Sequence, residues 1–187
     1  MNRTTTRIRT LLLGGLLAGG LGTALAAKPP ASPPEPPKPA AELDALQKIE
    51  GRWTCAGEAP AGPMGPGRKY ESTFRYARGL GGFFWLSEYD QAAGKQNPAA
   101  MAARGFLRWD AGHLAFNAFL NNGATAAESV SFDGRTYVGT GEMNAGGQAM
   151  GLRETLRLDG DRKMTWTGEI KMGKDYVVIG RDACRKD

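Results

Sequence analysis

Histidine and cysteine are scarce in this chain, which holds one histidine and two cysteines among its 187 residues. Hydrolysis by an activated nucleophile usually needs a histidine base that a third group orients, and His113 is the single candidate. Because His113 follows Gly112 at a predicted turn, we interpret it as a turn residue. One histidine and two cysteines are also too few for a typical metal site. We therefore expect no metal and no other cofactor.

Sequence motifs of common enzymes are missing as well. The chain has no Gly-x-Ser-x-Gly nucleophile elbow and no Gly-x-x-x-x-Gly-Lys-Ser/Thr phosphate loop. Its carboxylates lack calcium-loop spacing, and no pattern points to the paired carboxylates of a glycosidase. Gly139-Thr140-Gly141 lies in a predicted strand, where small residues relieve crowding. Catalysis is therefore the least favoured of the function classes considered below.

Long runs of like charge are absent after residue 26, where basic and acidic residues are interspersed. The formal net charge is +5, but residues 1–26 contain three arginines and no acidic residue, so the rest of the chain carries +2. Nucleic-acid-binding domains usually carry a concentrated basic face. We expect no nucleic-acid partner.

Residues 1–26 have the pattern of a secretory signal peptide. Three arginines precede an apolar run from Leu11, and Ala24-Leu25-Ala26 forms a small-residue cleavage site. The run is interrupted by glycines and is too short to span a membrane comfortably. We predict cleavage before Ala27, no membrane span in the mature protein, and a periplasmic or extracellular location, most simply in a Gram-negative bacterium.

A proline-rich linker is predicted for residues 27–41, because residues 28–41 hold seven of the eleven prolines. Such a segment extends as polyproline II and acts as a spacer or as a docking tract, of which the spacer is favoured. The remaining residues, 42–187, are long enough for one hydrophobic core and too short for two. We predict a single domain there.

Strand patterns separated by turn signals fill this domain. Residues 69–78 alternate between apolar and polar side chains, and pairs such as Asp133-Gly134 and Asp159-Gly160 separate similar segments. About ten strands result, with residues 92–103 as a rim loop. We predict an all-β fold, an antiparallel up-and-down barrel whose closure removes exposed edges.

The domain is expected to begin with a short amphipathic helix followed by Gly51 and Trp53. Leu43, Leu46 and Ile49 recur at three-residue spacing, which places them on one face. Gly51-x-Trp53 resembles the entry of lipocalin-like (calycin) barrels, where the tryptophan plugs the closed end and an arginine near the last strand packs over it. Arg181 and Arg185 are the possible counterparts, and Arg181 is our choice. A buried tryptophan on the entry strand of any β-sheet explains the pattern equally well.

The whole layout, with Phe106-Leu107-Arg108-Trp109-Asp110 and Met164 to Glu169 in the meander, resembles an uncharacterised family of bacterial secreted lipocalin-like domains. That resemblance implies a barrel and no established chemistry. Fatty-acid-binding proteins and nitrobindins share the ten-strand outline, and nitrobindins hold haem through a histidine. Here Thr54 to Glu58 replaces their glycine-rich pattern, and the histidine lies beside a turn, so haem binding is not favoured.

Cys55 and Cys184 are predicted to form a disulfide, because both lie in the exported part and an even count in an oxidising compartment favours pairing. They fall on the first strand and just past the last, which are neighbours in a closed barrel. We expect a structural bridge rather than reactive thiols.

Charged residues on apolar strand faces suggest a ligand site. Glu154 shares its face with Leu152 and Leu156, and Arg108 shares its face with Phe106. An interior Arg108–Glu154 pair would orient a polar ligand head or form a structural ion pair; alternatively, Arg108 faces out and Trp109 faces in. The candidate ligand-binding residues are Trp85, Phe106, Arg108, Phe116, Tyr137, Glu154 and Trp166.

We therefore expect a barrel that binds a small, largely apolar ligand. The alternative is a non-catalytic structural or interaction module of the cell envelope, with a filled barrel as platform and the proline tract as tether. Any binding site is expected at the end of the barrel opposite Trp53.

Overall fold

The structure is a computed structural model that describes residues 35–63, 65–95 and 100–187. The predicted signal peptide and the first part of the predicted linker lie outside the described residues. A compact unit spans Pro37–Asp187. Its elements are η1 (Ala41–Ile49), β1 (Gly51–Ala59), β2 (Arg68–Gly79), η2 (Leu80–Gly82), β3 (Phe84–Gln91), β4 (Met101–Asp110), β5 (His113–Leu120), β6 (Thr125–Phe132), β7 (Thr136–Ala145), β8 (Gln148–Asp159), β9 (Lys163–Met172) and β10 (Asp175–Lys186).

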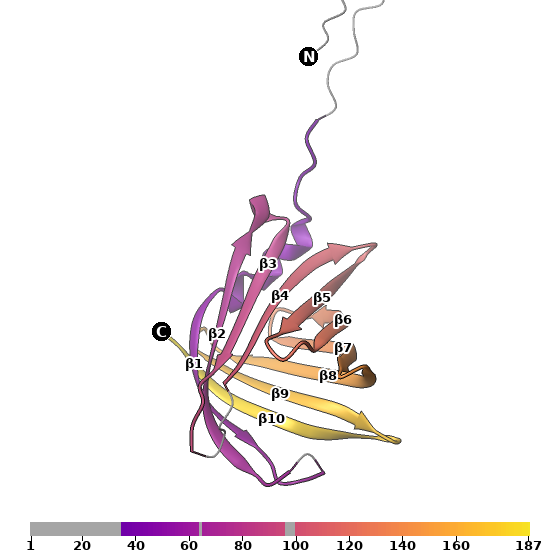
Figure 1. Cartoon of the computed structure of the whole chain (residues 1–187). Coiled ribbons are helices and arrows are strands. Elements are labelled where there is room, and N and C mark those ends of the chain that lie inside the picture. The colour runs from indigo at the N-terminus through magenta and orange to yellow at the C-terminus, as the bar shows by residue number, and fades with distance from the viewer. Residues whose placement is uncertain (1–34, 64, 96–99) are drawn as a thin grey trace, which may run out of the picture. The chain divides into compact units, whose positions relative to one another are not determined.

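Ten strands form one closed antiparallel barrel, in which each strand pairs with its sequence neighbours and β1 pairs with β10 (Figure 1). The predicted fold class is confirmed. Alternation along β1 places Trp53, Cys55, Gly57 and Ala59 in the interior and the residues between them outside. Of the expected rim loop, Met101–Ala103 already belongs to β4, and residues 96–99 lie outside the described residues.

The segment before β1 is a 3₁₀ helix rather than an α-helix. In a 3₁₀ helix, residues three apart lie directly above one another, so the spacing of Leu43, Leu46 and Ile49 gives a narrow apolar row. All three side chains are buried in the main core. The acidic residues Glu42 and Asp44 face away from this core. The helix therefore closes one end of the barrel with its apolar row.

Two tryptophans fix this closed end. The Trp53 indole donates a hydrogen bond to the Ile49 carbonyl oxygen over 2.9 Å, and that of Trp85 donates to the Leu43 carbonyl oxygen over 2.8 Å. Both side chains are fully buried. Because each indole satisfies a backbone carbonyl of η1, the tryptophans hold the helix to the first and third strands.

Arg181 does not pack over Trp53, contrary to our expectation. It lies on the outer face of β10, where it pairs with Glu58 at 3.8 Å. The cation over the Trp53 ring is Lys186, whose Nζ lies 5.3 Å from the ring centroid. Gly51 leaves room for that lysine, since a Cβ there would lie 2.8 Å from Lys186 Cε.

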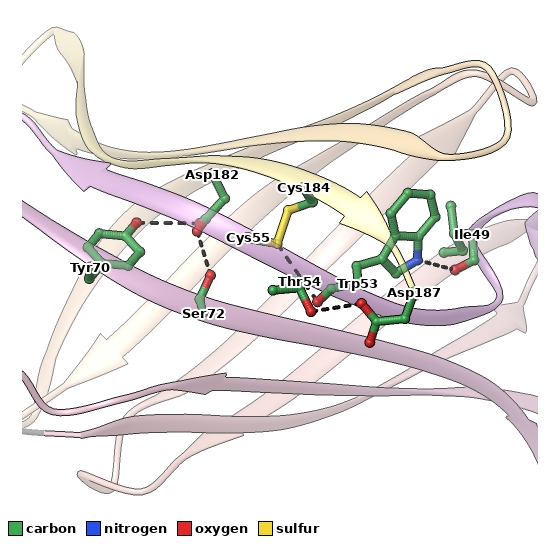
Figure 2. The surroundings of a disulfide bond; sticks show 9 residues. All are labelled: Ile49, Trp53, Thr54, Cys55, Tyr70, Ser72, Asp182, Cys184 and Asp187. Atoms are coloured by element: carbon green, nitrogen blue, oxygen red, sulfur yellow. Dashed lines mark hydrogen bonds between the residues drawn. A yellow bond between two sulfur atoms is a disulfide. The ribbon is translucent and has the colours of Figure 1, made fainter.

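The predicted disulfide is present and joins the two strands that close the barrel. Cys55 on β1 lies directly opposite Cys184 on β10, 129 positions away in sequence. Figure 2 shows it one pleat away from Trp53 and on the same side of the sheet. The bridge therefore links the ends of the meander across the β1–β10 seam.

The outer surface carries charges that pair across neighbouring strands. Arg153 on β8 makes a two-pronged contact with Glu169 on β9, at 2.6 and 2.8 Å, and Arg75 pairs with Glu88. Exposed pairs of this kind contribute little stability each. No helix among the described residues is long and apolar enough to cross a membrane.

Candidate functional site

A cavity of about 350 Å³ occupies the barrel interior. Its wall is mainly apolar, and the large side chains on it include Phe74, Leu107, Phe116, Leu152, Leu156 and Trp166. At its deep end it reaches Ile49 of η1. Trp53 does not line it. A cavity of this size and polarity is within the range of small-molecule sites.

Methionines surround the other end of the cavity. Met101 begins β4, Met143 lies near the end of β7, and Met150 lies near the start of β8. Thioether side chains adapt their shape to different apolar surfaces. Asn122, in the β5–β6 turn, is a polar residue at the same end. The end opposite the helix therefore provides a deformable apolar rim.

Two glutamates from different strands form the most unusual feature of this interior. Glu154 on β8 lines the cavity, and Glu128 on β6 is 5% exposed with both carboxylate oxygens buried and without a hydrogen-bond partner. Glu128 is opposite Gly141 of the intervening strand β7, and Glu154 is opposite Gly139. The two glycines therefore separate two inward-facing carboxyl groups.

Gly139 makes this arrangement possible. A methyl group at this position would collide with the Glu128 carboxylate, and one at Gly141 would collide with the Ala127 backbone. The Glu128 side chain therefore leans across β7, over the space that a larger residue would fill, toward Glu154. We predicted that small residues relieve crowding at this glycine pair. At Gly139, the space left by the missing side chain is occupied by the Glu128 carboxylate.

Burial and mutual repulsion govern the charge of this pair. Burial raises the pKa of Glu128 to about 9, and the neighbouring Glu154 carboxylate contributes to that rise. Burial also raises the pKa of Glu154, to about 7, while a hydrogen bond from the Trp166 indole opposes the shift. With no ligand bound, the pair therefore holds at least one proton at neutral pH.

Aromatic residues surround the pair. Burial raises the pKa of the Tyr76 and Tyr137 phenols well above the usual range, and the negative charges of Glu154 and Glu128 reinforce this. Both tyrosines line the cavity. They remain neutral at every physiological pH, so they contribute ring faces and hydroxyl groups but no charge.

A further buried carboxyl group lies nearer the β1–β10 seam and, unlike that of Glu128, is hydrogen-bonded. Asp182 on β10 accepts hydrogen bonds from Ser72 at 2.6 Å and Tyr70 at 3.4 Å (Figure 2). Burial raises its pKa, while these two hydrogen bonds lower it. Asp182 thus has protein partners that Glu128 lacks, and it links β10 to β2 across the intervening strand β1.

Four of the seven predicted ligand-binding residues line the cavity, namely Phe116, Tyr137, Glu154 and Trp166. Trp85 does not line it, because its indole is held under η1. Arg108 and Phe106 lie on the outer face: Arg108 contacts Asp110 at 3.0 Å, and the Phe106 ring packs edge-on against Phe84 with centroids 6.4 Å apart.

The hypothetical Arg108–Glu154 pair therefore does not form. Trp109 packs against the core. This agrees with the alternative prediction, in which Arg108 faces out and Trp109 faces in. From the sequence we singled out Glu154 but did not connect it with Glu128. The pair could have been found from the Gly139-x-Gly141 pattern of β7, because the strands on either side of it, β6 and β8, each carry one glutamate.

The described residues contain no group of three or more histidine, cysteine, aspartate or glutamate side chains placed to hold a metal ion. His113 is exposed at the start of β5, directly after the turn that Ala111 and Gly112 form. It is at the helix end of the barrel and does not line the cavity. The structure places no histidine where it could bind haem inside the barrel.

Comparison with known proteins shows the fold alone. No family model matches the chain, and no curated protein matches it in sequence. The crystal structure of Rv2717c from M. tuberculosis is similar, with a TM-score of 0.63 at 15% sequence identity, covering 80% of this chain and 99% of that chain. The two proteins share a barrel architecture.

Proposed function

We propose that this protein is an exported, lipocalin-like carrier or receptor that binds a small, largely apolar ligand in the barrel cavity and does not catalyse a reaction. The observation that carries the proposal is the interior space of about 350 Å³ with a mainly apolar wall. A barrel that serves only as a platform has no need of such a space, and filling it would stabilise the fold.

The positions of the plug and the rim support this proposal. The helix and two tryptophans close one end, whereas methionines surround the other. A ligand would enter past side chains that adapt to it and would stop against the floor near Ile49. The disulfide favours an oxidising compartment, in agreement with the predicted export.

Ala126 and Ala127 offer a matched pair of substitutions on one strand. Ala126 lines the cavity, whereas its neighbour Ala127 is exposed on the outer face of β6. Ala126→Phe should fill part of the cavity and weaken binding of the neutral fluorescent probe N-phenylnaphthylamine at least about tenfold, and Ala127→Phe should leave it unchanged. Equal probe binding by both variants and the parent protein, or no binding by the parent, would refute the proposal.

Native mass spectrometry of protein isolated from its own exported compartment addresses the natural ligand. A retained small molecule, absent from the Ala126→Phe variant, is the expected result. If the protein instead arrives empty and one envelope protein co-purifies with it, and if that protein is lost when residues 28–41 are deleted, the alternative of a tethered interaction module is favoured.

A further inference from the structure

We propose that the cavity selects apolar molecules that carry a protonated amine, with the ammonium group bound by Glu154 and Glu128. This inference rests on the proposed binding function and specifies the chemical class of its ligand. It is carried by the juxtaposition of an apolar cavity, the Glu154 carboxylate on its wall, and the buried, unpartnered carboxylate of Glu128, which lies over Gly139 opposite Glu154.

Both carboxylate oxygens of Glu128 are buried and lack a hydrogen-bond partner. Buried carboxylates are normally hydrogen-bonded or paired with a cation, because an isolated buried charge is very costly. Asp182 in the same barrel follows this rule through Ser72 and Tyr70. Glu128 has no such partner. A group that enters with the ligand is the missing partner.

Among the described residues, no lysine, arginine or histidine side chain is placed to neutralise this carboxylate. None of the residues lining the cavity is lysine, arginine or histidine. Arg108 is on the outer face with Asp110. Arg68 lies at the far end of β2 beside Tyr70 and does not reach the cavity wall. Within the described part of the chain, the carboxyl pair is therefore left for a cation from outside.

An ammonium group matches the geometry of this pair. It has three N–H donors, which can reach carboxylate oxygens from two different strands at once. The aromatic faces of Tyr137, Trp166 and Phe74 line the same cavity, and rings around a desolvated cation add further attraction. The apolar wall from Leu152 toward the methionine rim would hold the rest of the ligand.

The same arrangement disfavours ligands of the opposite charge. A fatty-acid carboxylate entering this cavity would lie near two carboxyl groups, with no arginine to receive it. Its binding would require either burial of like charges or uptake of protons. An uncharged alcohol avoids the repulsion but gains no ion pair. The expected order of affinity is therefore amine, then alcohol, then carboxylate.

The test compares three probes with the same chain, decylamine, decanol and decanoate, by isothermal titration calorimetry near pH 7. We expect decylamine to bind at least about tenfold more tightly than decanol, and decanoate to bind more weakly than decanol. Glu154→Gln and the Glu128→Gln/Glu154→Gln double variant should reduce the preference for decylamine over decanol to less than about threefold. Glu142→Gln, on the outer face of β7, is the matched control and should change nothing.

Proton release gives an independent readout. An ammonium group stabilises the ionised pair, so decylamine binding should release about one proton near pH 7, measured from the dependence of the heat on buffer ionisation enthalpy. Decanol should release none, and the Glu128→Gln/Glu154→Gln double variant should abolish the release.

Equal affinities of decylamine and decanol for the parent protein, or an amine preference that survives in the double variant, would overturn the inference while leaving the proposed function intact. If none of the three probes binds, the proposed function itself fails. Loss of folding does not confuse the result, because Glu128→Gln removes a buried, unpartnered carboxylate and Glu154→Gln keeps an oxygen that can accept the Trp166 indole hydrogen bond.

Discussion

Glu128→Gln should stabilise the folded protein at neutral pH, and the gain should disappear in acid. The unfolded chain holds Glu128 ionised above its ordinary pKa of about 4.3. Burial and the neighbouring Glu154 raise the pKa in the folded barrel to about 9. Between these two values the folded state binds a proton that the unfolded state does not. Stability from this group is therefore fully present below about pH 4 and is lost as the pH rises toward 9.

The size of the effect follows from these two pKa values. Each pH unit above about 4.3 costs about 1.4 kcal/mol, so keeping Glu128 protonated at pH 7 costs at most about 4 kcal/mol. Glutamine has a similar shape and no charge at any pH, so the variant avoids this cost. An amide is more costly to bury than a protonated carboxyl group. We therefore expect a net gain of about 2 to 3 kcal/mol at pH 7 and none below about pH 4.

Urea unfolding followed by tryptophan fluorescence measures this prediction. The free energy of unfolding would be determined with the disulfide intact at several pH values between about 4 and 8. Glu142→Gln serves as the control, because it replaces an exposed glutamate on a neighbouring strand and should give a flat difference. A gain of the same size at pH 4 and pH 7 would point to packing instead of charge. No gain at pH 7 would show that Glu128 has a partner in the folded protein.

Two further predictions concern the seat of this carboxylate and the barrel seam. Gly139→Ala should destabilise the barrel by about 1 to 3 kcal/mol, because its methyl group collides with the Glu128 carboxylate. The loss should be smaller in a Glu128→Ala background, and additive losses in urea unfolding would contradict the contact. Replacing Cys55 and Cys184 together by serine should lower the free energy of unfolding by about 2 to 4 kcal/mol. An unchanged unfolding midpoint would show that the strand pairing alone holds the β1–β10 seam.

The fold could be predicted from sequence because its signals are local. Turn pairs such as Asp133-Gly134 and alternating strands such as 69–78 each require only a few neighbouring residues. The disulfide followed from closure, since only a closed barrel makes the strands of Cys55 and Cys184 neighbours. The row of Leu43, Leu46 and Ile49 also gave the buried face of the helix correctly. Its exact three-residue period was a signal for the 3₁₀ form that we interpreted as an ordinary helix.

The errors arose where one strand face had to be assigned to the inside. Phe106 and Arg108 do share a face, as the alternation predicted, but that face is the outer one. Phe106, which is half-buried against Phe84 on that outer face, gave it the apolar character of a core. Arg181 was misplaced for the same reason, since a shift of one residue along β10 exchanges interior for exterior. Alternation gives two faces, and only contacts with other strands decide which of them is buried.

The Glu128–Glu154 pair shows what lies beyond local patterns. The two residues are on strands that do not pair with each other, and they approach only because Gly139 removes the side chain between them. Recognising the pair requires the register of β6, β7 and β8 at once, which depends on how the whole barrel closes. Neither glutamate has an unusual sequence neighbourhood. The two carboxyl groups are the strongly polar groups of an otherwise apolar interior. We therefore expect them to decide which ligand head groups, by their charge, the barrel favours.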